Sequence, residues 1–138
     1  MAFIRDKELG TYGRSLQRSI IEVFPDGIMP YTDMSSWRYD ASKWKRRAVP
    51  VAMIKLLKTV EDPVQLLDFI RPMMMDKERV VHQGLGWFLR ETWKKYPVQV
   101  ESFLLVWKDS SPRLIFQYAT EKMTPENKAR LKKAGKKN

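Results

Sequence analysis

The chain has 138 residues, of which 43% are hydrophobic and 30% charged, as in a single globular domain with its own core. It has no cysteine and one histidine, His82, which excludes disulfides, thiolate metal sites, histidine-rich metal sites and cysteine nucleophiles. The longest apolar run, 49–54, is far shorter than the ~20 residues of a membrane-spanning helix. Because the first residues also lack a secretory pattern, we expect a cytoplasmic protein without membrane contact.

Positive charge is concentrated near the C-terminus. The formal net charge is +10, from 26 Lys and Arg against 16 Asp and Glu. Six of these cations lie after residue 127, where no acid occurs, and removing them leaves +4 on residues 1–127. We therefore predict a folded domain over 1–127 and a solvated basic tail over 128–138 that adds affinity for polyanions without shaping the fold.

Proline marks most of the expected helix starts, because its missing N–H costs nothing in the first turn. Asp62-Pro63, Ser111-Pro112 and Thr124-Pro125 add a side chain that can cap the helix, and Tyr96-Pro97 is the same break without a cap. Apolar residues recur at helical spacing between these breaks, with no sustained strand alternation. The expected helices are 5–24, 29–39, 42–58 with a kink at Pro50, 63–72, 76–95, 97–107, 112–122 and 125–134.

The helices repeat. Pro63-Val64-Gln65-Leu66 recurs 34 residues later as Pro97-Val98-Gln99-Val100, and residues 80–83 correspond to 114–117 at the same offset. Two helix types that alternate with one period predict an all-α fold, an α-solenoid of antiparallel helix pairs with about eight helices. A plain helical bundle is the alternative.

Two motifs carry a family resemblance. Trp44-Lys45-Arg46-Arg47-Ala48-Val49 is followed, about forty residues later, by Gly84-Leu85-Gly86-Trp87-Phe88-Leu89-Arg90-Glu91, and then by the segment 113–122. Over residues 28–123 the chain resembles the DNA alkylation repair family of HEAT-like repeat proteins, which are alkylpurine DNA glycosylases. The resemblance implies HEAT-like helix pairs that hold duplex DNA on a concave face. It also implies hydrolysis of the N-glycosidic bond of cationic N3- or N7-alkylpurines, without a cofactor or a metal.

The resemblance assigns roles to individual side chains. Trp87 matches the tryptophan of the active cleft, where an indole face stabilises a cation by roughly 0.5–2 kcal/mol. Asp6, 38 residues before Trp44, is the acid near the spacing of the catalytic aspartate. Arg47 matches an arginine that faces DNA. The other DNA-binding candidates are Lys45, Arg46, Arg90, Lys94 and His82.

Each candidate also has a purely structural interpretation. Trp44 is expected in the core, and Trp87 fits core packing as well as an active cleft. His82 corresponds in the repeat to Phe116, which favours packing. Arg90 and Lys94 fit a solvated helix face. Asp33 and Asp40 are substitutes for the catalytic carboxylate, although helix capping is the commoner use of such residues.

The N-terminus departs from the family pattern. Position 2 is Ala2, where the family has a tryptophan ahead of its aspartate, so we expect a shortened member that lacks the N-terminal repeats. The expected partner is alkylated duplex DNA, with a nucleoid-associated location. A protein partner or self-association is a further possibility, and the sequence leaves open whether either completes the groove. The alternative function is a non-catalytic helical-repeat scaffold that binds protein or nucleic acid on its concave face.

Overall fold

The computed structural model describes residues 35–58 and 60–133, which form helices and turns and no strand. The prediction of an all-α fold is confirmed. The predicted helices 5–24 and 29–39 lie outside the described residues, apart from a helical turn at 35–37. The α-helices are α3 (Lys43–Met53), α4 (Pro63–Ile70), α5 (Arg79–Lys95), α6 (Pro97–Trp107), α7 (Arg113–Ala119) and α8 (Pro125–Arg130), and the 3-10 helices are η1 (Ile54–Lys58) and η2 (Arg71–Met73).

Three of the helix starts are capped by side chains. The Asp62 carboxylate accepts a hydrogen bond from the Val64 N–H at 3.0 Å, and the Thr124 hydroxyl accepts one from Asn127 at 3.2 Å. The Ser42 hydroxyl accepts one from Lys45 at the start of α3. The expected cap at Ser111 is wrong, because its buried hydroxyl donates to the carbonyl of Met74 at 2.7 Å. Ser111 therefore ties one repeat to the repeat before it.

The predicted helix 42–58 consists of two segments. Pro50 lies inside α3, within the buried stretch of that helix, and α3 ends at Met53, three residues further on. The chain continues as η1. A proline inside a helix removes one hydrogen bond of the ladder. Pro50 is therefore a local cause of the change from α-helix to 3-10 helix at Ile54.

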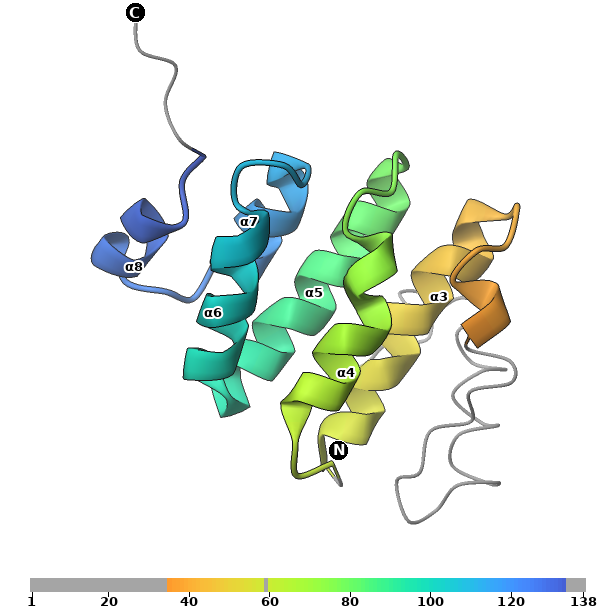
Figure 1. Cartoon of the computed structure of the whole chain (residues 1–138), viewed down its shortest axis with the longest axis horizontal. Coiled ribbons are helices and arrows are strands. Elements are labelled where there is room, and N and C mark those ends of the chain that lie inside the picture. The colour runs from red at the N-terminus through yellow and green to blue at the C-terminus, as the bar shows by residue number, and fades with distance from the viewer. Residues whose placement is uncertain (1–34, 59, 134–138) are drawn as a thin grey trace, which may run out of the picture.

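The helices form two layers, with α4 and α6 in front of α3, α5 and α7 in Figure 1. Helix direction alternates along the chain, so helices of one layer are parallel to each other and antiparallel to the other layer. Helix α5 lies between α3 and α7 and makes its most extensive contacts with them. The core between the layers contains fully buried side chains from both, among them Met53, Leu66, Leu85, Phe88, Leu104 and Phe116. This is the α-solenoid arrangement that the repeat predicts.

Helix α8 crosses the boundary predicted between the domain and the tail. Leu131 is only 1% exposed, and its carbonyl accepts a hydrogen bond from Arg113 at 3.0 Å. Arg130 pairs with Glu101 of α6 at 3.0 Å. Leu131 and the ion pair of Arg130 therefore hold the end of α8 against the helices before it. No helix in the described ranges is long and apolar enough to cross a membrane.

Candidate nucleic-acid interface

Helix α5 has one partly exposed stripe, which we call the outward stripe: Gln83, Trp87, Arg90 and Lys94. These residues are spaced four, three and four apart, which places them on one side of the helix. The opposite side, with Val81, Leu85 and Leu89, is fully buried against the other layer. Trp87 is only partly buried and packs against the edge of the core. One part of the indole therefore packs against the core and another part meets solvent.

Two glycines beside Trp87 bring the neighbouring helices close to α5. A Cβ on Gly84 would lie 3.1 Å from Cγ of Arg47 on α3. A Cβ on Gly86 would lie 2.9 Å from the carbonyl oxygen of Ile115 and would overlap with Cβ of Tyr118, both on α7. The motif Gly-Leu-Gly-Trp thus lets α3 and α7 approach on either side of the indole.

Arg47 reaches this surface from α3. Its Nη1 donates to the carbonyl of Val80 on α5 at 3.2 Å, and the side chain remains partly exposed. The structure therefore brings Arg47 and Trp87 to the same layer, on two adjacent parallel helices.

Arg90 and Lys94 of the outward stripe are ion-paired. Arg90 donates to Glu121, which follows α7, at 2.5 Å and lies 3.4 Å from Glu91. Lys94, with a side chain 48% exposed, lies 3.2 Å from the same Glu91. Glu91 is one turn after Trp87, and its side chain is only 16% exposed. Glu91 thus places a carboxylate between Arg90 and Lys94, one turn along the helix from Trp87, and the sequence motif contains this acid although sequence reasoning does not single it out.

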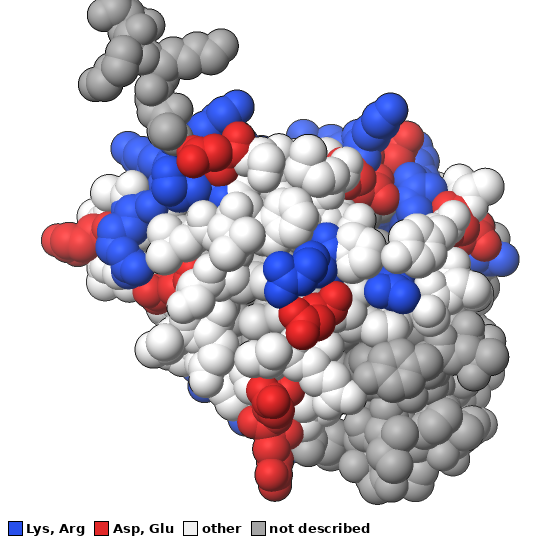
Figure 2. Space-filling view, viewed as in Figure 1, with Lys and Arg blue, Asp and Glu red and all other residues white. Residues whose placement is uncertain are grey.

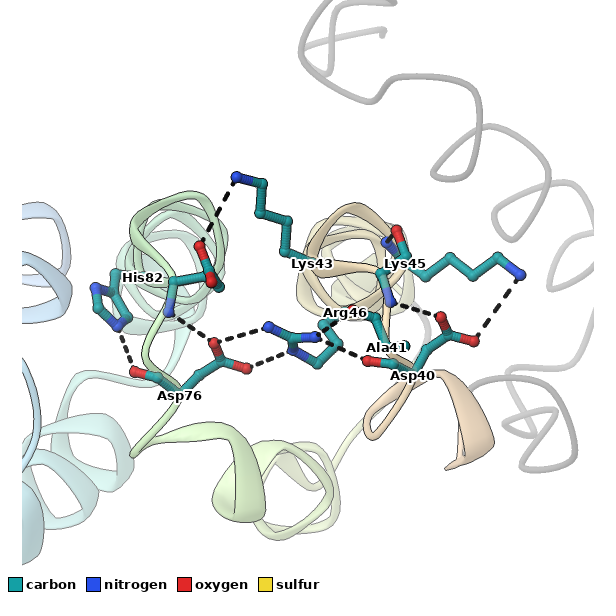
Figure 3. Close-up of polar contacts among 9 residues, drawn as sticks. Asp40, Ala41, Lys43, Lys45, Arg46, Asp76 and His82 are labelled. Carbon is teal, nitrogen blue, oxygen red and sulfur yellow. Dashed lines mark hydrogen bonds and ion pairs between the residues drawn. The ribbon is translucent and has the colours of Figure 1, made fainter.

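Arg46 and His82 serve the fold. Arg46 donates to both carboxylate oxygens of Asp76, at 2.7 and 3.4 Å, and to the carbonyls of Asp40 and Ala41 (Figure 3). The hydrogen bond that Arg46 donates to Asp76 raises the pKa of Arg46 above its ordinary value. His82 is 9% exposed, and its Nε2 lies 2.5 Å from the carbonyl oxygen of Asp76, so the ring N–H donates there. These two DNA-binding candidates are thus engaged within the protein, away from the outward stripe.

The contacts of Arg46 and His82 follow the same pattern, once in the turn before α3 and once in the turn before α5. The Asp40 carboxylate accepts a hydrogen bond from the N–H of Ser42, and the Asp76 carboxylate accepts one from Glu78. Arg46 and His82 each lie six residues after their aspartate and contact its carbonyl. Asp40 therefore stabilises the turn before α3, and the residue that caps this helix is Ser42.

Lys45 and Trp44 lie at the beginning of α3. Lys45 is 3.9 Å from Asp40, and its Nζ lies 5.3 Å from the ring centroid of Trp37. Trp44 is 52% exposed, so the expectation that it belongs to the core is wrong. Asp6 and Asp33 lie outside the described residues. Within the described part, no group of three or more acidic or histidine side chains is arranged to hold a metal ion.

Sequence comparison then identifies the family. No curated protein and no solved structure gives a significant match. A family model described as DNA alkylation repair enzyme matches residues 22–123, which include α3 to α7 and every residue of the outward stripe. Family membership indicates a function of the DNA alkylation repair type, with DNA as the general substrate. The match covers most of the chain, and the chain therefore belongs to the DNA alkylation repair enzyme family.

Proposed function

We propose that this protein binds alkylated duplex DNA on the surface formed by α3, α5 and α7 and excises cationic N3- or N7-alkylpurines. The supporting observation is the position of Trp87, half-buried on the outward stripe, with Arg47 on the adjacent helix and Arg90 on the next turn. An exposed indole face attracts a cation, and guanidinium groups around it attract the flanking phosphates.

The reaction needs stabilisation of positive charge more than it needs a strong acid. Water adds to C1′ of the deoxyribose and loses a proton, and the glycosidic electron pair moves to the purine nitrogen. The alkylpurine then leaves as a neutral base, since its positive charge is cancelled in that step. A carboxylate near the developing sugar cation lowers the barrier where water is excluded. We propose Asp6 for this role, and Glu91, one turn from Trp87, as the carboxylate that the described residues offer.

The decisive experiment is incubation of the purified chain with methylated duplex DNA, followed by detection of free 7-methylguanine or 3-methyladenine. Trp87→Phe is expected to reduce release, because phenylalanine presents a weaker face to a cation than tryptophan. Trp93→Phe is the matched control, since Trp93 lies on the same helix and its indole donates to Glu101. A wild-type chain that binds methylated DNA and releases no base would limit the function to DNA binding.

A second test compares the two carboxylates. Asp6→Asn is expected to abolish release if Asp6 is the catalytic carboxylate, with binding unchanged. Glu91→Gln is expected to abolish release if Glu91 takes that role. This variant also weakens the ion pairs that Glu91 forms with Arg90 and Lys94. Retention of full activity by both variants would overturn the proposal of an assisting carboxylate.

A further inference from the structure

Two exposed aromatic side chains lie at the beginning of α3. Tyr39 is 64% exposed and Trp44 is 52% exposed, and they are the two aromatic members among the exposed large hydrophobic residues of the described part. Trp44 is the second residue of α3, and Tyr39 lies in the turn before that helix.

Hydrogen bonds hold the turn that carries these rings, which we call the aromatic corner (residues 37–45). The N–H of Tyr39 donates to the carbonyl of Ser36, and the N–H of Asp40 donates to that of Trp37. The Asp40 carboxylate then accepts a hydrogen bond from Ser42, the residue that caps α3. The two rings are therefore presented by a defined corner of the fold.

Each aromatic ring of the corner has a cation beside it. Nζ of Lys43 lies 5.9 Å from the ring centroid of Trp44, and the guanidinium carbon of Arg38 lies 5.2 Å from that of Tyr39. Residues 37–45 contain three cations and one acid. Figure 2 shows Lys, Arg and acidic side chains interspersed along the edge where α3 and α5 begin, with mostly uncharged surface over α4 and α6.

We propose that the aromatic corner is a second nucleic-acid site, which binds unpaired bases of single-stranded DNA by stacking them on Trp44 and Tyr39. Every base has a π-face, so stacking tolerates any sequence. Lys43, beside the Trp44 ring, is placed to meet the phosphate of the stacked nucleotide, whereas the guanidinium of Arg38 donates to Ser35 and Phe69 and fixes the turn below Tyr39. With Glu78, which lies 3.8 Å from Lys43, counted among the acids, the corner still has three cations against two acids. This excess favours a polyanion over an apolar protein surface, which would leave these charges desolvated. The corner is separate from the outward stripe, so the inference goes beyond the proposed function.

The test measures fluorescence anisotropy of a labelled oligothymidylate and of a labelled duplex of the same length, at several salt concentrations. Trp44→Leu keeps an apolar side chain but removes the π-face, and it is expected to weaken single-strand binding roughly 5- to 150-fold. Trp44→Phe is expected to retain most of the affinity. Val106→Ala is the matched control for loss of exposed apolar surface, because Val106 is 69% exposed on α6.

Charge is tested in the same assay. Lys43→Ala is expected to make the salt dependence of single-strand binding shallower, whereas Lys122→Ala, an exposed lysine away from the corner, leaves the dependence as it is. Arg47→Ala separates the two sites, since it is expected to weaken duplex binding and spare oligothymidylate binding.

The inference is overturned if Trp44→Leu and Tyr39→Leu bind oligothymidylate as well as the unmodified chain does. It is equally overturned if both substitutions weaken duplex and single strand to the same extent, or if the wild-type chain fails to bind the single strand at low salt. Thermal unfolding of each variant shows whether the fold is intact, and Tyr39→Leu provides the test if Trp44→Leu unfolds. Loss of base release with single-strand binding intact would refute the proposed function alone.

Discussion

At the scale of single residues, the neighbouring cations Arg46 and Arg47 differ in their hydrogen-bond partners. Arg46 is 17% exposed in its side chain and donates to Asp76, Asp40 and Ala41. Arg47 donates to the carbonyl of Val80 on α5 and remains partly exposed. Adjacent helix residues point about 100° apart, so one arginine is directed between the repeats and the next toward the proposed DNA surface.

Replacing Arg46 is expected to change stability. Arg46→Ala leaves the largely buried Asp76 carboxylate without its cation, so we expect the free energy of unfolding to fall by about 2–3 kcal/mol. Urea unfolding followed by circular dichroism measures this loss. An unchanged unfolding midpoint would mean that the ion pair between the repeats contributes nothing.

Replacing Arg47 is expected to change binding. Arg47→Ala removes a phosphate contact, so duplex affinity should fall by a similar factor for every DNA sequence. Anisotropy with two unrelated duplexes measures this, and Arg71→Ala, an exposed arginine on the α4 side, is the control. A loss confined to one duplex would contradict a phosphate contact.

Trp87→Ala separates catalysis from packing. Because Trp87 is only partly buried, we expect a smaller loss of stability than the ~3–5 kcal/mol typical of a fully buried tryptophan. Base release is expected to fall further than binding of undamaged DNA, which presents no cationic base to the indole. Residual activity that merely follows the folded fraction would assign Trp87 to the core.

At the scale of elements, α5 organises the solenoid because it contacts both neighbours of its layer through glycines. The two glycines differ in the atoms that an added Cβ would meet. Gly84 meets mainly side-chain atoms of Arg47 and Val51, whereas Gly86 meets the backbone oxygen of Ile115 and the Cβ of Tyr118. Side-chain atoms move more easily than backbone, so the two positions differ in tolerance.

Alanine substitutions at the two glycines are expected to affect stability differently. Gly→Ala raises helix propensity by about 1 kcal/mol. At Gly84 we expect this gain to offset the displacement of Arg47, so that stability is nearly unchanged. Gly86→Ala is expected to destabilise by roughly 1–3 kcal/mol, because α7 has to move away. Melting temperatures of the two variants measure the difference, and equal melting temperatures would contradict the packing at Gly86.

At the scale of the whole molecule, helix α8 and the lysines that follow it are expected to have different roles. Leu131 is buried and Arg130 pairs with Glu101, so α8 is held by contacts with the helices before it. The basic end contributes charge, and its contribution to polyanion affinity stays a prediction.

Two truncations distinguish these roles. Removal of residues 134–138 is expected to leave the melting temperature unchanged and to make the salt dependence of DNA binding shallower, because two lysines are lost. Removal of 128–138 is expected to lower the melting temperature as well, since Leu131 leaves the core. Equal melting temperatures for both truncated chains would support the boundary predicted at residue 127.

Local chemistry decided much of the fold. Proline at the first helical position and the 3.6-residue apolar period act within one turn of their own segment, so α6 (Pro97–Trp107) has its predicted bounds and α4 starts at the predicted Pro63. The family motifs likewise selected Trp87 and Arg47, which the fold brings to one surface. The 34-residue repeat predicted the solenoid because stacking buries the apolar face that each helix pair leaves uncovered.

Contacts between segments distant in the chain were decided only by the tertiary structure. The use of Arg46 depends on Asp76, 30 residues away, and that of Ser111 on Met74, 37 residues away, so no local pattern indicates either contact. Residue type and position predict Trp44 in the core, yet the corner of the fold leaves it 52% exposed. Helix periodicity defines which side chains share a face, whereas the packing of neighbouring helices decides which face is covered.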